Sequence, residues 1–468
     1  MIPLALGDVA KACGATLVGA DASTVVTGVS TDSRAVQPGD LFVAIVGETH
    51  DAHDYIDNAL RAGAVAALVS RPVDAPSLMV SDTVEALGHL ARALLDRLAN
   101  CTVVAITGSS GKTSTKDVVA QVLASSAATI APPGSFNNEI GLPTTVLQAD
   151  ESTRFLVMEM GMRGHGHISY LCDIAPPAVA IVTNVGSAHI ELLGSQDAIA
   201  DAKSELVQAL PDSGVAVLNH DDHRVLAMRS RTRARVITYG ESEGSDVRAT
   251  HVTLDELARA SFMLEHSGAV LPVKLNLHGR HQVWNALAAA AAGLAVGLTL
   301  TDVARSLNEV TPASRWRMEV TRTTSGVTVI NDAYNANPES MDAALRALVA
   351  IGSTGARTWA VVGEMREIGE GSARAHRHVG ESIAALGIDC VIAVGEGARP
   401  VLEGVASTQS GSQAPLVLWA TTPDEAFETL NGLVGRGDVV LVKASRAIGL
   451  ERVAVALIEA QSGKDGEL

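Results

Sequence analysis

Residues 107–114, Thr-Gly-Ser-Ser-Gly-Lys-Thr-Ser, constrain how this chain can fold more than any other segment. They follow an apolar stretch at 103–106 that is typical of a buried strand, and they precede a helical pattern at 116–123. A glycine-rich turn between a strand and a helix directs backbone N–H groups and the helix N-terminus at an anion. The segment therefore predicts a phosphate-binding loop, with ATP as the expected ligand.

Individual residues of this loop have expected roles. Only two glycines, Gly108 and Gly111, form the turn, and Lys112 is expected to reach the terminal phosphates. The Thr113 hydroxyl is an oxygen ligand of the kind that Mg²⁺ accepts. The alternative is an ordinary Gly-Ser turn without a ligand. The predicted ATP-binding residues of the loop are Gly108, Ser109, Ser110, Gly111, Lys112, Thr113 and Ser114.

Length and charge exclude several classes of function. A chain of 468 residues is too long for one hydrophobic core, so two to four domains are expected. The net charge of −17 argues against a nucleic-acid partner and against binding to an anionic membrane. The most apolar stretch, 286–300, is shorter than the roughly 20 residues that span a bilayer, and a buried helix is the better interpretation.

The cysteines and the first residues bear on the compartment. The four cysteines lie far apart and have no metal-type spacing, which indicates a reducing compartment without a disulfide framework. Residues 1–9 lack a basic region followed by an apolar one, so no secretory signal is expected. We expect a soluble cytoplasmic protein without stable membrane insertion.

The order of apolar and helical stretches predicts an α/β fold with three domains. Residues 1–98 form a small α/β unit, and residues 99–312 read as a central parallel sheet with strands at 103–107, 155–160, 178–184, 215–219 and 235–239. Residues 313–468 alternate five strands with helices, which is typical of a doubly wound, Rossmann-like domain.

Two residues that follow predicted central strands are candidate metal ligands. Glu159 follows one strand, and His189 lies shortly after the next. Ligands in open α/β sheets bind beyond the carboxyl ends of the strands, so both side chains can face one Mg²⁺ ion and a terminal phosphate. Alternatively, Glu159 is a capped loop residue, and His189 is a core histidine whose hydrogen bonds are satisfied within the protein.

Lys203 lies on the apolar stripe of a predicted helix, on the same face as Ile199 and Leu206. Burial would lower the pKa of its ammonium and leave a fraction as free amine, which reacts with CO₂ to give a carbamate. A carbamate is an acidic group that can hold Mg²⁺. The alternative, which helix geometry alone favours, is that Lys203 extends past small neighbours to solvent.

Polar residues also gather at strand ends outside the central unit. Residues 331–337, Asn-Asp-Ala-Tyr-Asn-Ala-Asn, are too polar to be only core, and they predict either a ligand surface or an Asn-rich turn. Residues 363–365 and 443–446 place further charges at the same rim. In the first unit, Ser33 and Arg34 suit a diphosphate or sugar nucleotide, although a turn with a solvated arginine fits equally well.

Several further segments share one order along the chain. They are 137–143, 158–161, 183–186 with His189, 202–205, His281 with Asn285, and 331–338. Together with the loop, they closely resemble the Mur ligases, the ATP-dependent amide-forming enzymes of peptidoglycan precursor synthesis, over essentially the whole chain. Within that family, the Asp-x-Tyr-Asn-Ala-Asn-Pro form at 332–338 is similar to the ligase that adds D-alanyl-D-alanine.

The resemblance implies roles for particular residues. Ser33 and Arg34 would lie near the diphosphate of a UDP-linked substrate. The residues that would bind the peptide substrate are Asn137, Asn138 and Asn335. Lys112 would be catalytic, and Thr113 and Glu159 would hold Mg²⁺, while His189 and a carbamylated Lys203 would serve catalysis and a second Mg²⁺. Asn285 would reach the adenine, and Arg317 and Asp332 the ribose or phosphates.

The implied reaction joins D-alanyl-D-alanine to UDP-N-acetylmuramoyl-tripeptide through an acyl phosphate. The C-terminal domain would close on the site and bring in the dipeptide. We expect a monomer with small-molecule substrates and, from the net charge, no nucleic-acid partner. Two alternatives stay open, namely a sister ligase of the same family that adds a different amino acid, and a P-loop nucleotide switch. The sister ligase that adds the third amino acid of the peptide carries an Asp-Tyr-Ala-His sequence and an Asp-Asn-Pro-Arg motif. This chain contains neither of them.

Overall fold

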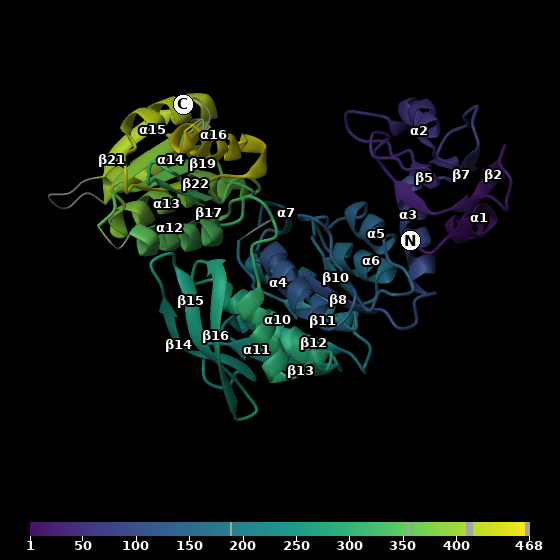
Figure 1. Cartoon of the computed structure of the whole chain (residues 1–468), viewed down its shortest axis with the longest axis horizontal. Coiled ribbons are helices and arrows are strands. Elements are labelled where there is room, and N and C mark those ends of the chain that lie inside the picture. Colours follow the sequence, from purple (N-terminus) through teal and green to yellow (C-terminus); the bar gives the residue numbers. More distant parts are fainter. Residues whose placement is uncertain (188–189, 353–354, 409–414, 464–468) are drawn as a thin grey trace.

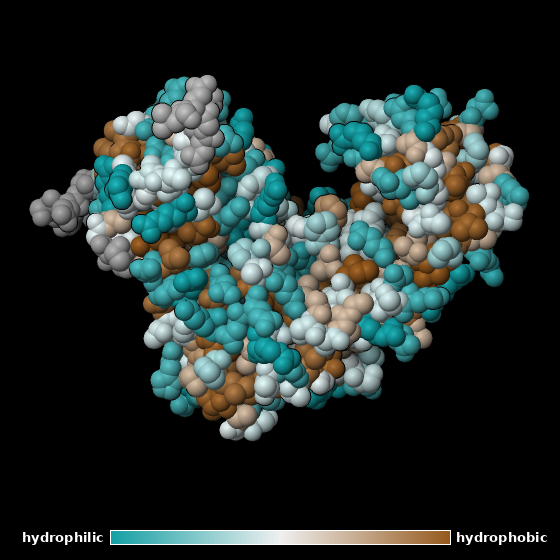
Figure 2. Space-filling view, viewed as in Figure 1, coloured by the Kyte–Doolittle hydropathy of each residue, from teal (hydrophilic) through white to brown (hydrophobic). Residues whose placement is uncertain are grey.

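The structure is a computed structural model, and it describes residues 1–187, 190–352, 355–408 and 415–463. Its three large sheets follow one another along the chain. Figure 1 shows the purple N-terminal part and the green-to-yellow C-terminal part at opposite ends of the central part. Figure 2 shows the surface hollowed between these two ends.

The N-terminal part is built on a five-stranded sheet in the order β2-β7-β6-β5-β4, in which only the β2–β7 pair is antiparallel. Its strands are β2 (Thr16–Val18), β4 (Gly28–Ser30), β5 (Asp40–Val43), β6 (Ala66–Val69) and β7 (Ser77–Met79), and β1 (Leu4–Ala5) pairs separately with β3 (Val25–Val26). Its helices are α1 (Leu6–Cys13), α2 (Ile56–Ala62) and α3 (Thr83–Leu95).

The central part holds a nine-stranded sheet in the order β16-β15-β14-β13-β12-β11-β8-β10-β9. From β9 at one edge to β14, each strand is parallel to the next strand in this order, as expected for the central unit. They are β8 (Thr102–Thr107), β9 (Thr129–Ile130), β10 (Phe155–Glu159), β11 (Val179–Val182), β12 (Val215–Asn219), β13 (Arg235–Gly240) and β14 (Val247–Leu254). The sequence pattern did not predict β14, nor the antiparallel β15 (Arg259–His266) and β16 (Ala269–His278) that extend the sheet.

Helices cover both faces of the central sheet. They are α4 (Lys112–Ala124), α5 (Gly141–Val146), α6 (His167–Ile174), α7 (Ile190–Leu193), α8 (Gln196–Gln208), α9 (His223–Ala227), α10 (Gln282–Ala295) and α11 (Leu300–Glu309). The buried helix expected at 286–300 corresponds to α10, which begins and ends a few residues earlier, at Gln282 and Ala295. Helices α4 and α10 pack together on one face, and α3 of the N-terminal part packs against α5 and α6 on the other.

The C-terminal part has a six-stranded sheet in the order β17-β18-β22-β19-β20-β21, parallel except for β17. Its strands are β17 (Glu319–Arg322), β18 (Thr328–Asn331), β19 (Thr358–Gly363), β20 (Cys390–Val394), β21 (Leu416–Ala420) and β22 (Val439–Lys443). Its helices are α12 (Pro338–Gly352), α13 (Ser372–Ala385), α14 (Pro400–Ser407), α15 (Pro423–Leu433) and α16 (Glu451–Ser462). Buried clusters on both faces confirm the doubly wound architecture. In the described ranges, no helix combines the length and the apolar character that crossing a bilayer requires.

Candidate active site

The glycine-rich loop lies between β8 and α4, at the carboxyl end of β8, as predicted. Gly108 has φ 153°, and a Cβ atom added there would lie 1.8 Å from the Thr183 hydroxyl oxygen. Gly111 has φ 77°, which L-residues with side chains rarely adopt. Both glycines are therefore required by the conformation of the loop.

The end of the neighbouring strand β11 holds the loop in place. The Ser110 N–H donates to Asn184 Oδ1 at 2.9 Å, and Asn184 Nδ2 donates to Ser110 Oγ at 2.9 Å. The Gly186 N–H donates to Ser109 Oγ at 2.8 Å. Asn184 thus preorganises the loop, a role that the sequence interpretation did not assign to it although it noted the segment.

Lys112 and Thr113 begin α4 and face an acidic residue. Lys112 Nζ donates to the Gly108 carbonyl oxygen at 2.7 Å. Burial lowers the pKa of Lys112, whereas the nearby charge of Glu159 raises it. The Thr113 hydroxyl donates to Glu159 Oε2 at 2.6 Å, and Asn137 Nδ2 donates to Glu159 Oε1 at 2.7 Å. Glu159 is the last residue of β10 and lines the cavity described below, so it does not lie in a capped loop.

The pair of Thr113 and Glu159 offers a hydroxyl and a carboxylate oxygen side by side, a donor set that fits Mg²⁺. Among the described residues, no group of three or more His, Cys, Asp and Glu side chains is arranged to hold a metal ion. Such a partial set is typical of Mg²⁺ that is bound together with phosphates. His189 lies outside the described residues.

Lys203 is buried in α8, with 1% of the residue exposed, between the buried Ile199 and Leu206. The alternative that its side chain extends to solvent is therefore wrong. Burial, and secondarily the positive charge of Lys112, lower the pKa of Lys203 well below its usual value. Both effects shift the equilibrium of Lys203 from the ammonium toward the neutral amine.

The C-terminal part contributes a second set of charged groups. Lys443 Nζ, at the end of β22, donates to Asp332 Oδ2 at 2.6 Å and to the Asn335 carbonyl oxygen at 2.8 Å. The Arg317 guanidinium stacks on the Tyr334 ring at 4.1 Å, and its buried Nε atom has no hydrogen-bond partner among the described residues. The sequence interpretation did not single out the pairing of Lys443 with Asp332.

Helix α10 presents polar groups to the same space. Asn285 Oδ1 accepts from the Thr115 hydroxyl at 3.0 Å, and Asn285 Nδ2 donates to Gln282 Oε1 at 2.8 Å. His281 is half-buried, its buried Nδ1 atom is unpaired among the described residues, and desolvation lowers its pKa. These amide and imidazole groups suit an uncharged polar ligand group.

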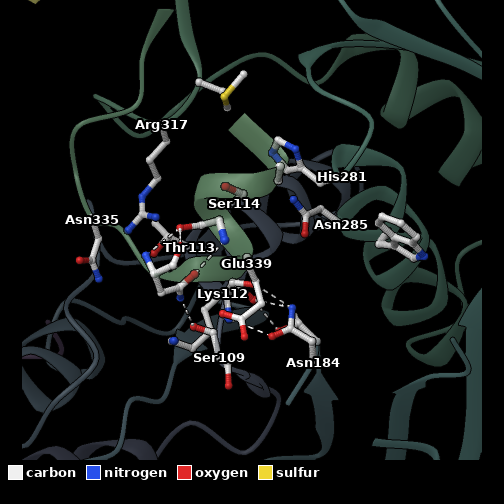
Figure 3. Close-up of a pocket in the computed structure, with 18 of the residues that line it drawn as sticks. Ser109, Lys112, Thr113, Ser114, Asn184, His281, Asn285, Arg317, Asn335 and Glu339 are labelled. Atoms are coloured by element: carbon white, nitrogen blue, oxygen red, sulfur yellow. Dashed lines mark hydrogen bonds between the residues drawn. The ribbon is translucent and has the colours of Figure 1, made fainter. Parts of the chain in front are cut away.

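These elements enclose a cavity of about 450 Å³. Figure 3 shows Ser109, Lys112 and Thr113 of the loop converging on it with Arg317, Asn335 and Glu339 of the C-terminal part. The predicted site residues that line it are Ser109, Ser110, Gly111, Lys112, Thr113, Ser114, Asn137, Glu159, Asn285, Arg317, Asp332 and Asn335. Its size and mixed lining suit a nucleotide with part of a second substrate.

Some predicted residues do not line this cavity. Gly108 and Lys203 are not among its lining residues, and Asn138 Oδ1 accepts from the Gly141 N–H, at the start of α5, at 2.9 Å. Ser33 and Arg34 follow β4 in the N-terminal part. Arg34 is exposed and pairs with Asp32 at 2.7 Å, and its hydrogen bonds lower the pKa of Asp32 to about 2.

Three family models match consecutive segments of the chain. They are the Mur ligase family, catalytic domain at residues 25–94, the Mur ligase middle domain at 106–293, and the Mur ligase, glutamate ligase domain at 316–446. The UDP-N-acetylmuramoyl-tripeptide–D-alanyl-D-alanine ligase of Mycobacterium tuberculosis is 44% identical over 92% of each protein. The enzyme of that name from Escherichia coli is 36% identical over 98% of this chain and 99% of that protein.

Solved structures agree with these matches. The crystal structure of MurF from Acinetobacter baumannii superimposes with a TM-score of 0.87 at 31% identity, covering 97% of this chain and 99% of that one. The MurF ligase from Thermotoga maritima, solved in complex with ADP, superimposes with a TM-score of 0.79 at 31% identity, covering 94% and 99%.

Proposed function

This chain belongs to the Mur ligase family, and we propose that it uses ATP to join D-alanyl-D-alanine to UDP-N-acetylmuramoyl-tripeptide. The product is the UDP-linked pentapeptide of peptidoglycan synthesis. The observation that carries this proposal is the cavity in which the phosphate loop, Lys112 and the C-terminal Asp332 face one another. The chain also covers nearly the full length of relatives that bear this name.

The reaction has two steps. A carboxylate oxygen of the tripeptide attacks the γ-phosphorus of ATP, which forms the O–P bond of an acyl phosphate and breaks the bond to ADP. The dipeptide amine then attacks the carbonyl carbon, phosphate leaves with its oxygen, and the amine loses a proton. Residues 108–111 and Lys112 orient the phosphates and offset their negative charge, and closure of the C-terminal domain over the cavity would keep water from the acyl phosphate.

The Thr113 hydroxyl and Glu159 would hold a Mg²⁺ ion, because they present adjacent oxygen ligands beside the loop. Bound there, the ion would neutralise charge on the phosphates. Asn137, which donates to Glu159, orients this carboxylate.

Lys203 would carry a carbamate, and with His189 it would serve a second Mg²⁺ ion. The neutral amine attacks the carbon of CO₂, an N–C bond forms, and one proton passes to solvent. The burial of Lys203 and the charge of Lys112 support this assignment, because both favour the neutral amine. The product is an anion, which the neighbouring Lys112 stabilises.

The remaining residues divide between the two substrates. Asn285 would contact the adenine, and Arg317 and Asp332 the ribose or phosphates, since all three line the cavity. Asn137, Asn138 and Asn335 would face the muramoyl peptide, and Ser33 and Arg34 the UDP diphosphate. The exposed guanidinium of Arg34 at the end of β4 supports the last assignment.

Domain limits at residues 98 and 312 complete the proposal, since each large sheet falls within one of the three ranges. The C-terminal domain, 313–468, would close on the site. We further propose that the enzyme is a monomer that works in the cytoplasm on these small-molecule substrates, without nucleic acid or membrane insertion.

The test is a ligation assay with UDP-N-acetylmuramoyl-tripeptide, Mg²⁺, ATP and a panel of amine acceptors. We expect one phosphate per UDP-pentapeptide, and phosphate release only when both co-substrates are present. Product with a single amino acid in place of the dipeptide would identify a sister ligase. Phosphate release that is independent of both co-substrates would identify a nucleotide switch.

A further inference from the structure

A second large cavity, of about 430 Å³, lies beside the segment at 313–316, which joins α11 to β17 and is called the linker below. The linker forms one wall. The facing wall is formed by the side of α4 around Ala120 and by the loop at 131–134 that follows β9. Tyr334 is the only described residue that lines both this cavity and the active-site cavity. The second cavity is therefore a separate space, to which the function proposed above assigns nothing.

The charges in the lining leave one cation without a partner. Lys116 Nζ donates to the carbonyl oxygens of Pro132 and Gly134 at 2.6 and 3.0 Å, and it lies 2.8 Å from Asp117 Oδ1. These contacts use the three donors of the ammonium and offset the charge of Asp117. Arg315 also lines the cavity, is exposed, and forms no ion pair within the described ranges. The lining therefore has a net positive charge that belongs to Arg315.

An aromatic ring is held in place at the wall of the cavity. Trp316 has φ 58°, a left-handed conformation that is rare for a bulky residue and persists only where surrounding contacts impose it. Its N–H donates to Glu319 Oε2 at 3.2 Å, and its carbonyl oxygen accepts from the Tyr334 N–H at 3.2 Å. The Arg446 guanidinium stacks on the indole at 4.2 Å. The fixed indole and the ring of Pro133 give the cavity flat apolar surfaces.

We propose that this cavity binds a small molecule in which an aromatic ring carries one anionic group, such as a carboxylate, sulfonate or phosphate. The ring packs against Trp316 and Pro133, and the anion pairs with the guanidinium fork of Arg315. The volume lies within the range of roughly 300 to 1,000 Å³ that small-molecule sites occupy. This second site goes beyond the ligase function, since its lining contains no residue of the phosphate loop.

The position of the cavity couples its ligand to the nucleotide. Gln121 of α4 ties the central part to the chain just before the linker, because its Oε1 accepts from the Thr311 N–H at 3.0 Å and its Nε2 donates to the Thr311 carbonyl oxygen at 2.9 Å. Beyond the linker, the Tyr334 hydroxyl donates to Ser135 Oγ of the central part. Both cavities thus form where the two parts meet. A ligand that binds this arrangement tightens nucleotide binding, and the nucleotide tightens ligand binding by the same factor.

The first measurement titrates the full-length enzyme with 8-anilino-1-naphthalenesulfonate, an aromatic sulfonate whose fluorescence rises in apolar surroundings. Saturating Mg·ADP is present, so that the active-site cavity is filled. We expect one probe per chain, and a Kd about tenfold higher in Arg315→Met, which removes the cation. Ala120→Phe should raise the Kd at least as much, because its ring occupies the cavity.

The matched control for Arg315→Met is Arg233→Met, at an exposed arginine of the loop before β13, and it should bind the probe as wild type does. Ligase activity in each variant reports that the chain is folded. A wild-type enzyme without saturable binding, or a Kd that neither Arg315→Met nor Ala120→Phe changes, would overturn the proposed site.

The second measurement repeats the titration without nucleotide. We expect the Kd of the probe to be at least about threefold higher than with Mg·ADP, and the probe to lower the Kd of Mg·ADP by the same factor in wild type but not in Arg315→Met. Displacement of the probe by ADP, or equal affinity with and without ADP, would contradict the coupled site. Neither measurement involves amide formation, so failure of this proposal leaves the ligase function intact.

Discussion

At the scale of single residues, the site brings two lysines within electrostatic reach of each other. Lys203 is buried, and both its burial and the charge of Lys112 lower its pKa. An unmodified Lys203 is therefore a cost to folding, which the proposed carbamate would convert into an attraction to Lys112. Proteins often retain such costs where function requires them.

The first prediction follows from this cost. Because the native pKa of Lys203 is lowered, the unfolded chain binds more protons, and wild-type stability falls as the pH drops from about 10.4 toward the native pKa. In CO₂-free buffer at pH 7, Lys203→Met should raise the free energy of unfolding by about 1 kcal/mol or more, and this gain should shrink at pH 10. Urea unfolding at both pH values measures the difference. A variant that is less stable than wild type at pH 7 would refute the assignment.

The second prediction concerns the carbamate itself. Lys203→Ala should lose nearly all ligase activity, because it removes the group that becomes the anion. Short-chain carboxylic acids added to this variant should restore part of the activity by supplying a carboxylate in the vacated space. Lys11→Ala, at an exposed lysine of α1, is the control and should behave as wild type. Full activity of Lys203→Ala without any addition would contradict the carbamate.

The position of Lys203 shows what residue patterns can and cannot predict. The helical period placed it correctly among Ile199 and Leu206. Whether the Lys203 amine reaches solvent depends on the strands and helices packed around α8. The spacing of apolar residues along one helix contains no information about those neighbours. For Arg34, the sequence left a ligand role and a solvated turn equally open, and the structure shows an exposed pair with Asp32.

At the scale of elements, the phosphate loop depends on its two glycines. Gly108→Ala would drive a Cβ atom to within 1.8 Å of the Thr183 hydroxyl oxygen, so the loop must shift. We expect the Kd for Mg·ATP to rise at least about tenfold, since the N–H groups would lose their common target. Calorimetric titration measures this Kd.

Gly134→Ala is the matched control for Gly108→Ala. Gly134 also has a positive φ, 63°, but no atom lies within 4 Å of an added Cβ. It should therefore show only the conformational strain of alanine in that region, with an unchanged Kd. Equal effects of the two substitutions on Mg·ATP binding would show that the conformation of the loop does not control the affinity.

Strands with continuous apolar runs were predictable, and half-buried ones were not. β8 and β10 are almost entirely buried, and their sequences show it directly. In β14 and β16, buried residues alternate with partly exposed ones, and one end of each strand is largely exposed to solvent. β16 also contains Pro272, and a proline weakens the sequence pattern of a strand. The turn at Ser267 and Gly268, both with positive φ, sets the antiparallel pairing of β16 with β15, and β15 in turn pairs antiparallel with β14.

At the scale of the whole molecule, the cavity exists only where the central and C-terminal parts meet. Glu339 Oε1 accepts from the N–H and the hydroxyl of Ser187 at 2.8 and 2.9 Å. Tyr334 donates its hydroxyl hydrogen to Ser135 Oγ at 3.1 Å. The sequence named residues on both sides, but their meeting depends on surface complementarity that no local pattern encodes.

The fourth prediction tests this junction. Glu339→Ala removes the acceptor of both Ser187 hydrogen bonds; under the proposed closure of the C-terminal domain, this should shift the equilibrium toward the open form by about tenfold. Small-angle scattering should show a larger radius of gyration than for wild type, and kcat should fall. Glu403→Ala, at a surface pair within the C-terminal part, is the control. If the scattering curves of Glu339→Ala and wild type coincide, the hydrogen bonds between Ser187 and Glu339 do not hold the central and C-terminal parts together.

The most direct test of the central claim follows one oxygen atom. UDP-N-acetylmuramoyl-tripeptide labelled with ¹⁸O in its reacting carboxyl group is ligated to D-alanyl-D-alanine, and the released phosphate is analysed by mass spectrometry. If the loop at 108–111 transfers the γ-phosphoryl group of ATP to that carboxylate, each phosphate carries one ¹⁸O atom. Phosphate that contains only unlabelled oxygen would mean that water attacks ATP in this cavity, which would contradict the acyl-phosphate account.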